Sequence, residues 1–315
     1  MIKGYKPMLA TDWYEDKVKF PCIVQVKIDG VHSVNQDGLM LSRRLRAHDN
    51  KFTDSKFARS FLHGICGELT LGPDPTLPDL CNLTSGALRT IEGEPDIHWW
   101  VFDYCTEDTY KLGYSKRMQI FQDSVLYGIP KEFNLHLIES KIVYTMEELL
   151  AFEEKALQEG YEGIMIRDPF APYKFGRCGK TFMGVWRVKR FVDAEFRIEE
   201  IIEGRTNQNK AEVNALGLTE RSTHKENMLP NGMVGTLRGK LLKDVLDPTT
   251  KEVILKEGLT IDVSPGKMTE EERKKVFQDQ SLFLGKIGKF KLFPKGTKDK
   301  PRFGQFQCLR NENDI

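Results

Sequence analysis

The pattern of the chain changes after about residue 191, and this change constrains the fold more than any other feature. Before it, strand-like runs alternate with a capped helix. After it come four short strand-like runs separated by Gly, Pro and Asn, at 195–203, 234–243, 252–263 and 286–293. One helix, capped by Thr269, interrupts them. Five or so short strands and a helix in about 125 residues fit a small barrel of the OB type. We therefore expect two domains, 1–190 and 191–315.

The first half predicts a mixed α+β domain. In the strand at 22–29, alternate apolar residues would face a core and turn Lys27 and Asp29 to the other side. A capping box at Thr145 opens a helix that Gly160 ends. Three further strands are expected at Trp99–Tyr104, Glu162–Arg167 and Val185–Phe191.

Charge and composition exclude several classes of protein. The 47 basic and 46 acidic residues give a net charge of +1, so the chain is not a uniformly basic nucleic-acid binder. No apolar stretch approaches the roughly 20 residues that span a bilayer, and the N-terminus does not resemble a signal peptide. Six scattered cysteines form no C-x-x-C pair, which argues against a zinc knuckle or a disulfide framework. We expect a soluble intracellular protein, cytoplasmic or nuclear, or one that acts inside a host cell.

Two stretches invite interpretation as phosphate or polyanion sites. Residues 285–310 carry eight basic side chains against one acid, with phenylalanines between them, but this segment alone favours a strand with solvated lysines on one face. Residues 176–181 resemble the end of a P-loop. That motif needs a glycine at position 174, which is lysine here, so we reject a Walker-type ATPase.

The sequence Lys27-Ile28-Asp29-Gly30 is a stronger signal. A lysine attacks as the neutral amine, so it needs a pKa lowered by burial or by neighbouring cations. Arg187 and Lys189 would supply those cations if their strand lies beside Lys27. Taken alone, the motif also fits a surface lysine before a hairpin.

The motif becomes specific through those that follow it in order. These are Ser42-Arg43-Arg44, Gly67-Glu68, Phe102-Asp103-Tyr104, Glu162-Gly163-Ile164-Met165-Ile166-Arg167 and Arg187-Val188-Lys189. The series resembles the covalent nucleotidyltransferases, which are the DNA ligases, RNA ligases and mRNA capping enzymes. Further segments, among them Tyr173-Lys174-Phe175-Gly176-Arg177 and Lys298-Asp299-Lys300-Pro301-Arg302-Phe303, resemble the minimal ATP-dependent DNA ligases of the Chlorella virus type. The resemblance covers nearly the whole chain.

This resemblance implies the fold and the reaction. The fold would be α+β, with an ATP-grasp-like nucleotidyltransferase domain of antiparallel sheets and flanking helices, followed by an OB-fold β-barrel. The enzyme would seal 3′-OH/5′-phosphate nicks in duplex DNA through lysyl-AMP and DNA-adenylate, using ATP and Mg²⁺ or Mn²⁺, as a monomer. The alternatives are an RNA ligase, a capping guanylyltransferase, or an inactive OB-type nucleic-acid clamp.

The resemblance also implies residue roles. Lys27 would take AMP, Asp29 would orient it with a metal that Glu162 shares, and Lys189, with Arg187, would contact the α-phosphate. Glu68 would bind the sugar and Phe102 would stack on adenine. Further nucleotide contacts are implied for Glu162, Arg43, Arg177, Lys298 and Arg302. Contacts with the nick are implied for His32, Arg43, Arg44 and Arg177. Each residue also has a plain structural interpretation, as a core aromatic or a solvated charge.

Three positions depart from the family pattern, and one segment is added to it. His32 stands where the family has arginine, and it would lose its charge near neutrality. Arg187 replaces a lysine, and Cys66 replaces an aspartate, which would remove one acid near the metal site. The polar segment 204–233 is long for a loop in a compact domain and resembles a DNA-enclosing latch.

Overall fold

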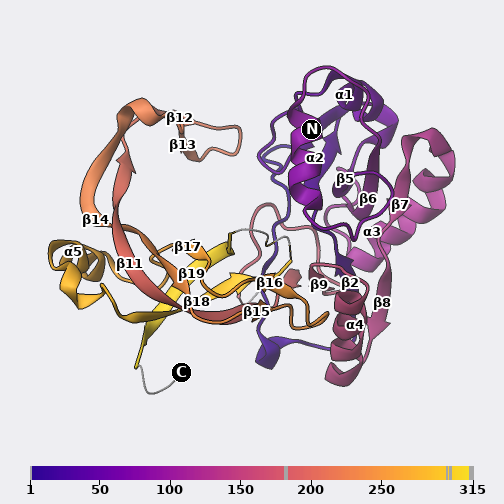
Figure 1. The fold of residues 1–315 in the computed structure, drawn as a ribbon. Helices are drawn as coiled ribbons and strands as arrows, with labels where there is room; N and C mark the ends of the chain where they lie inside the picture. Colours follow the sequence, from indigo (N-terminus) through magenta and orange to yellow (C-terminus); the bar gives the residue numbers. More distant parts are fainter. Residues whose placement is uncertain (1, 181–183, 296, 298–299, 312–315) are drawn as a thin grey trace. The chain divides into compact units, whose positions relative to one another are not determined.

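The computed structural model describes residues 2–180, 184–295, 297 and 300–311. The chain folds as two compact units, Met1–Lys189 and Arg190–Ile315, drawn in indigo to magenta and in orange to yellow in Figure 1. Among the described residues, no helix is long and apolar enough to cross a membrane.

Unit 1 contains two five-stranded sheets. The first has the order β1 (Thr11–Asp12), β10 (Val185–Val188), β9 (Gly163–Arg167), β2 (Cys22–Lys27), β8 (Ser140–Val143). The second has the order β4 (Leu39–Ser42), β3 (Val31–Gln36), β5 (Ile65–Leu71), β6 (Ile97–Tyr104), β7 (Leu135–Leu137). Neighbouring strands are antiparallel except β1 with β10 and β6 with β7.

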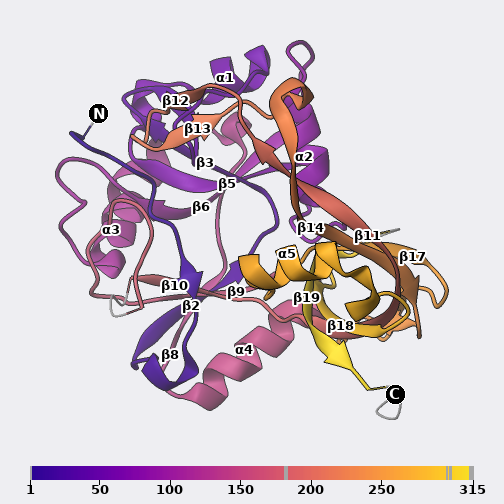
Figure 2. The same cartoon turned by 90° about the vertical axis from the view of Figure 1, so that its left-hand side faces the viewer.

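Helices cover the sheets of unit 1. They are α1 (Lys51–Phe57), α2 (Leu80–Arg89), α3 (Tyr114–Ile120), which continues into a π-helical turn at Phe121–Val125, and α4 (Met146–Gln158). Short 3₁₀ segments lie at Glu15–Lys17, Ser60–Leu62, Leu126–Gly128 and Lys131–Phe133. Helix α4 packs its apolar stripe on β2, β8 and β9, and Figure 2 shows it beside β8. Thr145 caps α4 as expected, by accepting a hydrogen bond from the Glu148 amide.

The face of β2 opposite α4 is not solvated. Cys22, Val24 and Val26 enter the core as the alternation predicts. However, Gln25 is only 2% exposed and Asp29 only 6%. The second face of β2 is therefore buried as well, because Tyr114 of α3 and Arg167 of β9 both make hydrogen bonds with Gln25.

The segment between β2 and β3 joins the two sheets. Strand β2 ends at Lys27 in the first sheet, and β3 begins at Val31 in the second. Gly30 makes the crossing possible, since a Cβ there would lie 2.4 Å from the Leu69 carbonyl oxygen. Its role there is close approach to β5.

Unit 2 is a curved five-stranded sheet with one helix. Its order is β17 (Thr260–Val263), β14 (Met228–Leu241), β11 (Val192–Asn207), β18 (Ile287–Phe293), β19 (Arg302–Arg310). A small ladder pairs β15 (Val245–Leu246) with β16 (Val253–Leu255), and 3₁₀ segments lie at Lys225–Asn227 and Gln280–Leu282. Helix α5 (Glu270–Gln278) has the full capping box predicted at Thr269. One bridge, Ser264 with Gln305, joins the edge strands, so among the described residues of this unit no continuous ladder closes the barrel.

The segment 204–233 is an extended hairpin. Strands β11 and β14 stay paired as far as Asn207 and Met228, and β12 (Ala211–Val213) pairs with β13 (Thr219–Arg221) at the tip. Figure 1 shows this arm projecting from the sheet. Asn209 holds the base of the tip by donating to the carbonyls of Ser222 and His224, each at 2.9 Å. The segment is therefore a hairpin and not an irregular loop, and its backbone ladders satisfy the polar groups of the main chain.

Candidate functional site

Two lysines share one carboxylate at the end of β2. The Nζ atoms of Lys27 and Lys189 donate to the two oxygens of Glu162. The Glu162 side chain is fully buried, while the side chains of Lys27 and Lys189 are 18% and 19% exposed. The predicted catalytic residues Lys27 and Lys189 and the predicted metal ligand Glu162 thus lie together.

The register of the first sheet brings this cluster together. Lys27 pairs with Gly163, and the Glu162 amide donates to the Lys27 carbonyl at 3.0 Å. Lys189 follows β10, whose Val188 lies opposite Ile164. Gly163 has a φ of +148°, and a Cβ there would lie 2.3 Å from the Val188 oxygen. Only glycine therefore lets β10 approach closely enough to place Lys189 on Glu162.

The charges in the cluster set its protonation. Burial would lower the pKa of Lys27, but Glu162, then Glu68 and Asp29, outweigh burial and raise it. Burial and the Lys27 charge lower the pKa of Lys189. Burial would raise the pKa of Glu162, yet the two ammonium groups lower it. The ground state is therefore an ionised Glu162 with a protonated Lys27.

The expectation that Arg187 and Lys189 lower the pKa of Lys27 is wrong. The carboxylates around Lys27 dominate its electrostatics. Arg187 lies on β10, and its Nε donates to Asp12 on β1 at 2.6 Å. Lys189 joins the cluster, whereas Arg187 is engaged in a separate, partly exposed ion pair.

The second sheet contributes Glu68. Burial raises the pKa of Glu68 to about 8, against the opposing effect of Lys27. Asp29, buried in the crossing segment, adds to this rise and also acts on Lys27 and Lys189. Glu68 is therefore largely protonated at neutral pH.

Phe102 and His32 form an aromatic contact beside Glu68. Their ring centroids are 5.4 Å apart, and His32 lies opposite Glu68 in the β3–β5 ladder. Both ring nitrogens of His32 are buried with no hydrogen-bond partner among the described residues. Burial, and then Arg43, lower the pKa of His32 to about 4. The expectation of a charge lost near neutrality is thus wrong, because the imidazole is already neutral there.

The predicted arginines are distributed differently. Arg43 and Arg44 are exposed beyond β4, and Arg43 is close enough to act on His32 and Glu68. Arg177 is exposed and donates to the Ala10 carbonyl at 2.8 Å. In unit 2, Arg302 donates to the Lys295 carbonyl at 3.0 Å and stacks on Phe293. Lys298 lies outside the described residues.

Cys66 does not lie in the lysine cluster. Its sulfur contacts the hydroxyls of Tyr5 and Tyr173 at 3.8 and 3.7 Å in a separate apolar cluster. The β-bulge between Cys66 and Gly67 turns this side chain away from the face that carries Glu68. The expectation that Cys66 removes an acid near the metal site is therefore wrong.

Sequence analysis missed a buried polar network behind Phe102. Its members are Gln25, Asp103, Tyr114, Arg117 and Arg167, each exposed by no more than 4%. A signal was available, because Asp103 and Arg167 are charged residues in or beside otherwise apolar strands. Their joint burial requires pairing, but the sequence does not say with which partner.

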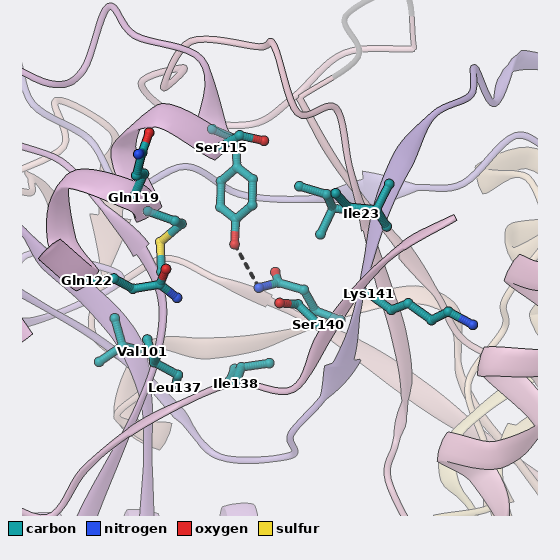
Figure 3. A pocket seen from close by; sticks show the side chains of 13 residues that line it. Ile23, Val101, Ser115, Gln119, Gln122, Leu137, Ile138, Ser140 and Lys141 are labelled. Atoms are coloured by element: carbon teal, nitrogen blue, oxygen red, sulfur yellow. Dashed lines mark hydrogen bonds between the residues drawn. The ribbon is translucent and has the colours of Figure 1, made fainter. Parts of the chain in front are cut away.

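A cavity of about 230 Å³ lies on the outer side of this network. Residues of β2, α3, β8 and the segment after β7 line it, and the dashed line in Figure 3 marks the hydrogen bond from Gln25 Nε2 to the Tyr114 hydroxyl at 2.8 Å. Gln119, Gln122 and Ser140 give the cavity a polar lining.

Among the described residues, one group of three His or acidic side chains gathers its donor atoms within 4.8 Å: Asp37, His63 and Glu107. Both nitrogens of His63 are already engaged, with the Asp37 amide and with Glu107, each at 3.0 Å. The carboxyl groups around Lys27 are not preassembled in this way.

Known proteins share this architecture. The model of the ATP-dependent DNA ligase domain family matches residues 87–185. A DNA ligase of African swine fever virus is 25% identical over 216 residues, covering 65% of this chain and 50% of that protein. A DNA ligase of Halobacterium salinarum is 28% identical over 158 residues, covering 49% and 27%. The chain thus spans about half the length of the viral relatives it matches, or less.

Solved structures match nearly the whole chain. The Chlorella virus DNA ligase-adenylate matches with a TM-score of 0.52 and 24% identity, over 98% of this chain and 99% of that one. A structure from a study of Lig E DNA ligases has a TM-score of 0.66 and 18% identity, over 97% and 99%.

The chain has the two-domain fold of these solved DNA ligase structures, an α+β domain followed by an OB-type domain, which confirms the predicted fold class. Within this fold, residues 87–185 are similar to the ATP-dependent DNA ligase domain.

Proposed function

We propose that the chain seals nicks in duplex DNA, using ATP and a covalent lysyl-AMP intermediate on Lys27. The observation that carries this proposal is the convergence of Lys27, Glu162 and Lys189, with Glu68 and Asp29 acting on the same lysine. Unit 1 would bind the nucleotide, and unit 2 would be the OB-fold domain. The enzyme would act as a monomer.

In the first step, the neutral Nζ of Lys27 attacks the α-phosphorus of ATP. An N–P bond forms, the P–O bond to pyrophosphate breaks, and the lysine loses its proton. Because Glu162 and the other carboxyl groups keep Lys27 protonated in the free protein, nucleotide binding must rearrange the cluster. The α-phosphate would compete with Glu162 for Lys189, and Lys189 would then stabilise the charge that grows in the transition state.

Glu68 and Phe102 would hold the nucleoside. Glu68, protonated near neutrality, would donate a hydrogen bond to a ribose hydroxyl without placing a second full negative charge near the phosphates. Phe102 would offer its ring to adenine. His32, neutral and lacking a partner among the described residues, would supply one donor and one acceptor beside them.

The later steps would use the exposed arginines. AMP passes from Lys27 to the 5′-phosphate of the nick, and attack by the 3′-OH then joins the strands and releases AMP. Arg43, Arg44 and Arg177 would bind phosphates, for which a guanidinium is suited. Lys298 and Arg302 of unit 2 would orient the pyrophosphate leaving group, and the hairpin at 204–233 would enclose the duplex.

A divalent metal fits the chemical type of the site. Mg²⁺ binds through one or two carboxylates together with substrate phosphates, and Asp29 and Glu162 would be those carboxylates. Both oxygens of Glu162 are occupied by ammonium groups in the free protein, so the metal would arrive with the nucleotide. It would supply charge neutralisation at the phosphates.

An assay on a singly nicked duplex tests this proposal. Purified protein is incubated with α-labelled ATP, and the adduct and the sealed strand are followed on denaturing gels. A labelled protein and ATP-dependent sealing of DNA are expected. Labelling by GTP instead would indicate a capping enzyme, and sealing of RNA alone an RNA ligase. Nick binding without any adduct would indicate an inactive clamp.

A further inference from the structure

Arg167 stands at the centre of the buried network. It is the last residue of β9 and is 4% exposed. Its Nε donates to the Gln25 side-chain oxygen at 2.5 Å, and one terminal nitrogen donates to Asp103 at 2.9 Å. The guanidinium carbon lies 5.3 Å from the centre of the Phe102 ring and 4.6 Å from that of Tyr114.

Asp103 anchors Arg167 and a second arginine. Arg117 of α3 makes a two-point contact with this carboxylate, at 2.9 and 3.0 Å. The Tyr104 amide donates to one of the same oxygens at 2.8 Å. Each oxygen of the Asp103 carboxylate therefore accepts two hydrogen bonds, and the position of this carboxylate fixes both guanidinium groups.

Tyr114 closes the network. Its hydroxyl accepts from Gln25 and donates to the Phe102 carbonyl at 3.1 Å. Gln25 lies two residues before Lys27 on the same face of β2. Two paths thus run from Gln25, on the strand that carries Lys27, to Phe102. One passes through Arg167 to the ring, and the other passes through Tyr114 to the backbone carbonyl.

We propose that Arg167 is a positioning residue, which holds the base-stacking ring of Phe102 in register with the nucleophile on β2. This inference rests on the proposed nucleotide chemistry of Lys27 and Phe102. Nucleophilic attack needs the reacting atoms aligned to within a fraction of an ångström. Those two residues lie on different sheets, so something must fix one sheet against the other, and Arg167 contacts both.

Arg117 provides a matched control. It is equally buried, pairs with the same carboxylate and belongs to the same network. Its remaining hydrogen bonds go to the Leu112 and Ala171 carbonyls, and its guanidinium stacks on Tyr114 and Tyr173 rather than on Phe102. A purely structural role for the buried ion pairs predicts the same effect from both arginines.

The experiment compares Arg167→Lys with Arg117→Lys. Both changes keep the charge and lose the planar fork. Single-turnover formation of the Lys27 adduct is measured across ATP concentrations, together with the melting temperature. For Arg167→Lys we expect half-saturation by ATP to rise, or the maximal rate to fall, by about tenfold. Arg117→Lys should lower the melting temperature comparably but change adduct formation by no more than about twofold.

A double-mutant cycle with Phe102→Leu separates positioning from stability. If Arg167 acts through the ring, Arg167→Lys should lose most of its effect on ATP saturation in the Phe102→Leu background. Should Arg167→Lys fail to fold, Tyr114→Phe removes only the hydroxyl that joins Gln25 to Phe102, and the same shift in ATP saturation is expected. Any of three outcomes would overturn the inference. These are an equal loss of adduct formation in both arginine variants, full additivity in the double-mutant cycle, or unchanged ATP saturation in Tyr114→Phe. A wild-type protein that forms no adduct would instead refute the proposed function.

Discussion

Lys27 and Glu162 are joined twice, once through their side chains and once through the backbone. The Lys27 ammonium binds the carboxylate, and the Glu162 amide donates to the Lys27 carbonyl at 3.0 Å. The backbone contact does not depend on charge, so Glu162 stays beside Lys27 when the lysine loses its proton. The side-chain contact depends on the proton and keeps the amine unreactive in the free protein.

Replacing Lys27 should separate chemistry from stability. Lys27→Arg keeps a cation for Glu162 but offers no nucleophile at neutral pH, so the adduct should vanish with little change in the free energy of unfolding. Lys27→Ala should also abolish the adduct and destabilise the fold by about 1–3 kcal/mol, because Glu162 keeps only Lys189. Adduct labelling and urea unfolding measure the two effects. An acid-labile AMP adduct on either variant would move the nucleophile elsewhere.

His32 should make the protein sensitive to acid. Its pKa is about 4 in the folded protein and about 6.5 in an unfolded chain. The unfolded state therefore binds more protons between these values, and stability falls as pH drops from about 6.5 towards 4, by up to about 3 kcal/mol. Above pH 6.5 this group has no effect. The groups that act on His32 are Arg43, Arg167 and Lys27, each of which lowers its pKa further.

The measurement for His32 compares wild type with His32→Phe, which keeps an aromatic ring against Phe102. Urea unfolding at pH 4.5, 5.5, 6.5 and 7.5 should show a flatter pH profile for the variant. His48 also has a pKa lowered by burial, so His48→Phe controls for a general histidine effect. Parallel profiles for wild type and His32→Phe would mean that His32 takes up its proton as readily in the folded state as in the unfolded one.

Among the described strands of unit 1, hydrophobic patterning predicted β2, β6, β9 and β10, because strands such as β2 and β9 bury an apolar face whatever surrounds them. The other six described strands of this unit were not predicted. The partners of Lys27 were predictable only as a set of motifs. They meet because β2 and β10 both pair with β9, the strand that Glu162 directly precedes. The network around Arg167 was not predictable, because its contacts join β2, β6, β9 and α3 across the gap between two sheets. The predicted lowering of the Lys27 pKa was wrong for a related reason. Arg187 and Lys189 are two residues apart in sequence, but they bind different carboxylates, those of Asp12 and Glu162.

Shortening the hairpin should affect DNA binding alone. Residues 208–227 can be replaced by an Asn-Gly turn, because Asn207 and Met228 are the last pair of the β11–β14 ladder. The variant should retain lysine adenylation, since the Lys27 cluster lies wholly in unit 1. It should lose affinity for nicked duplex on the order of tenfold, with a shallower salt dependence, because Lys210, Arg221 and Lys225 are removed. Fluorescence anisotropy across salt concentrations measures both, and an equal loss of adenylation would make the hairpin a structural element of the whole enzyme.

The last prediction concerns the glycine that lets the chain cross between the sheets. A methyl group at Gly30 would lie 2.4 Å from the Leu69 carbonyl oxygen, which is backbone of β5 and has no freedom to move aside. Gly30→Ala should therefore destabilise the protein by about 2–4 kcal/mol. It should also slow adenylation, since Asp29 precedes this contact and Lys27 lies at the other end of the same segment. Gly86→Ala is the matched control: Gly86 is inside α2 with no atom within 4 Å of its would-be Cβ, so alanine should stabilise by about 0.5–1 kcal/mol. The melting temperature should fall for Gly30→Ala and rise for Gly86→Ala. A Gly30→Ala protein as stable and as active as wild type would show that β5 can move away from the crossing segment.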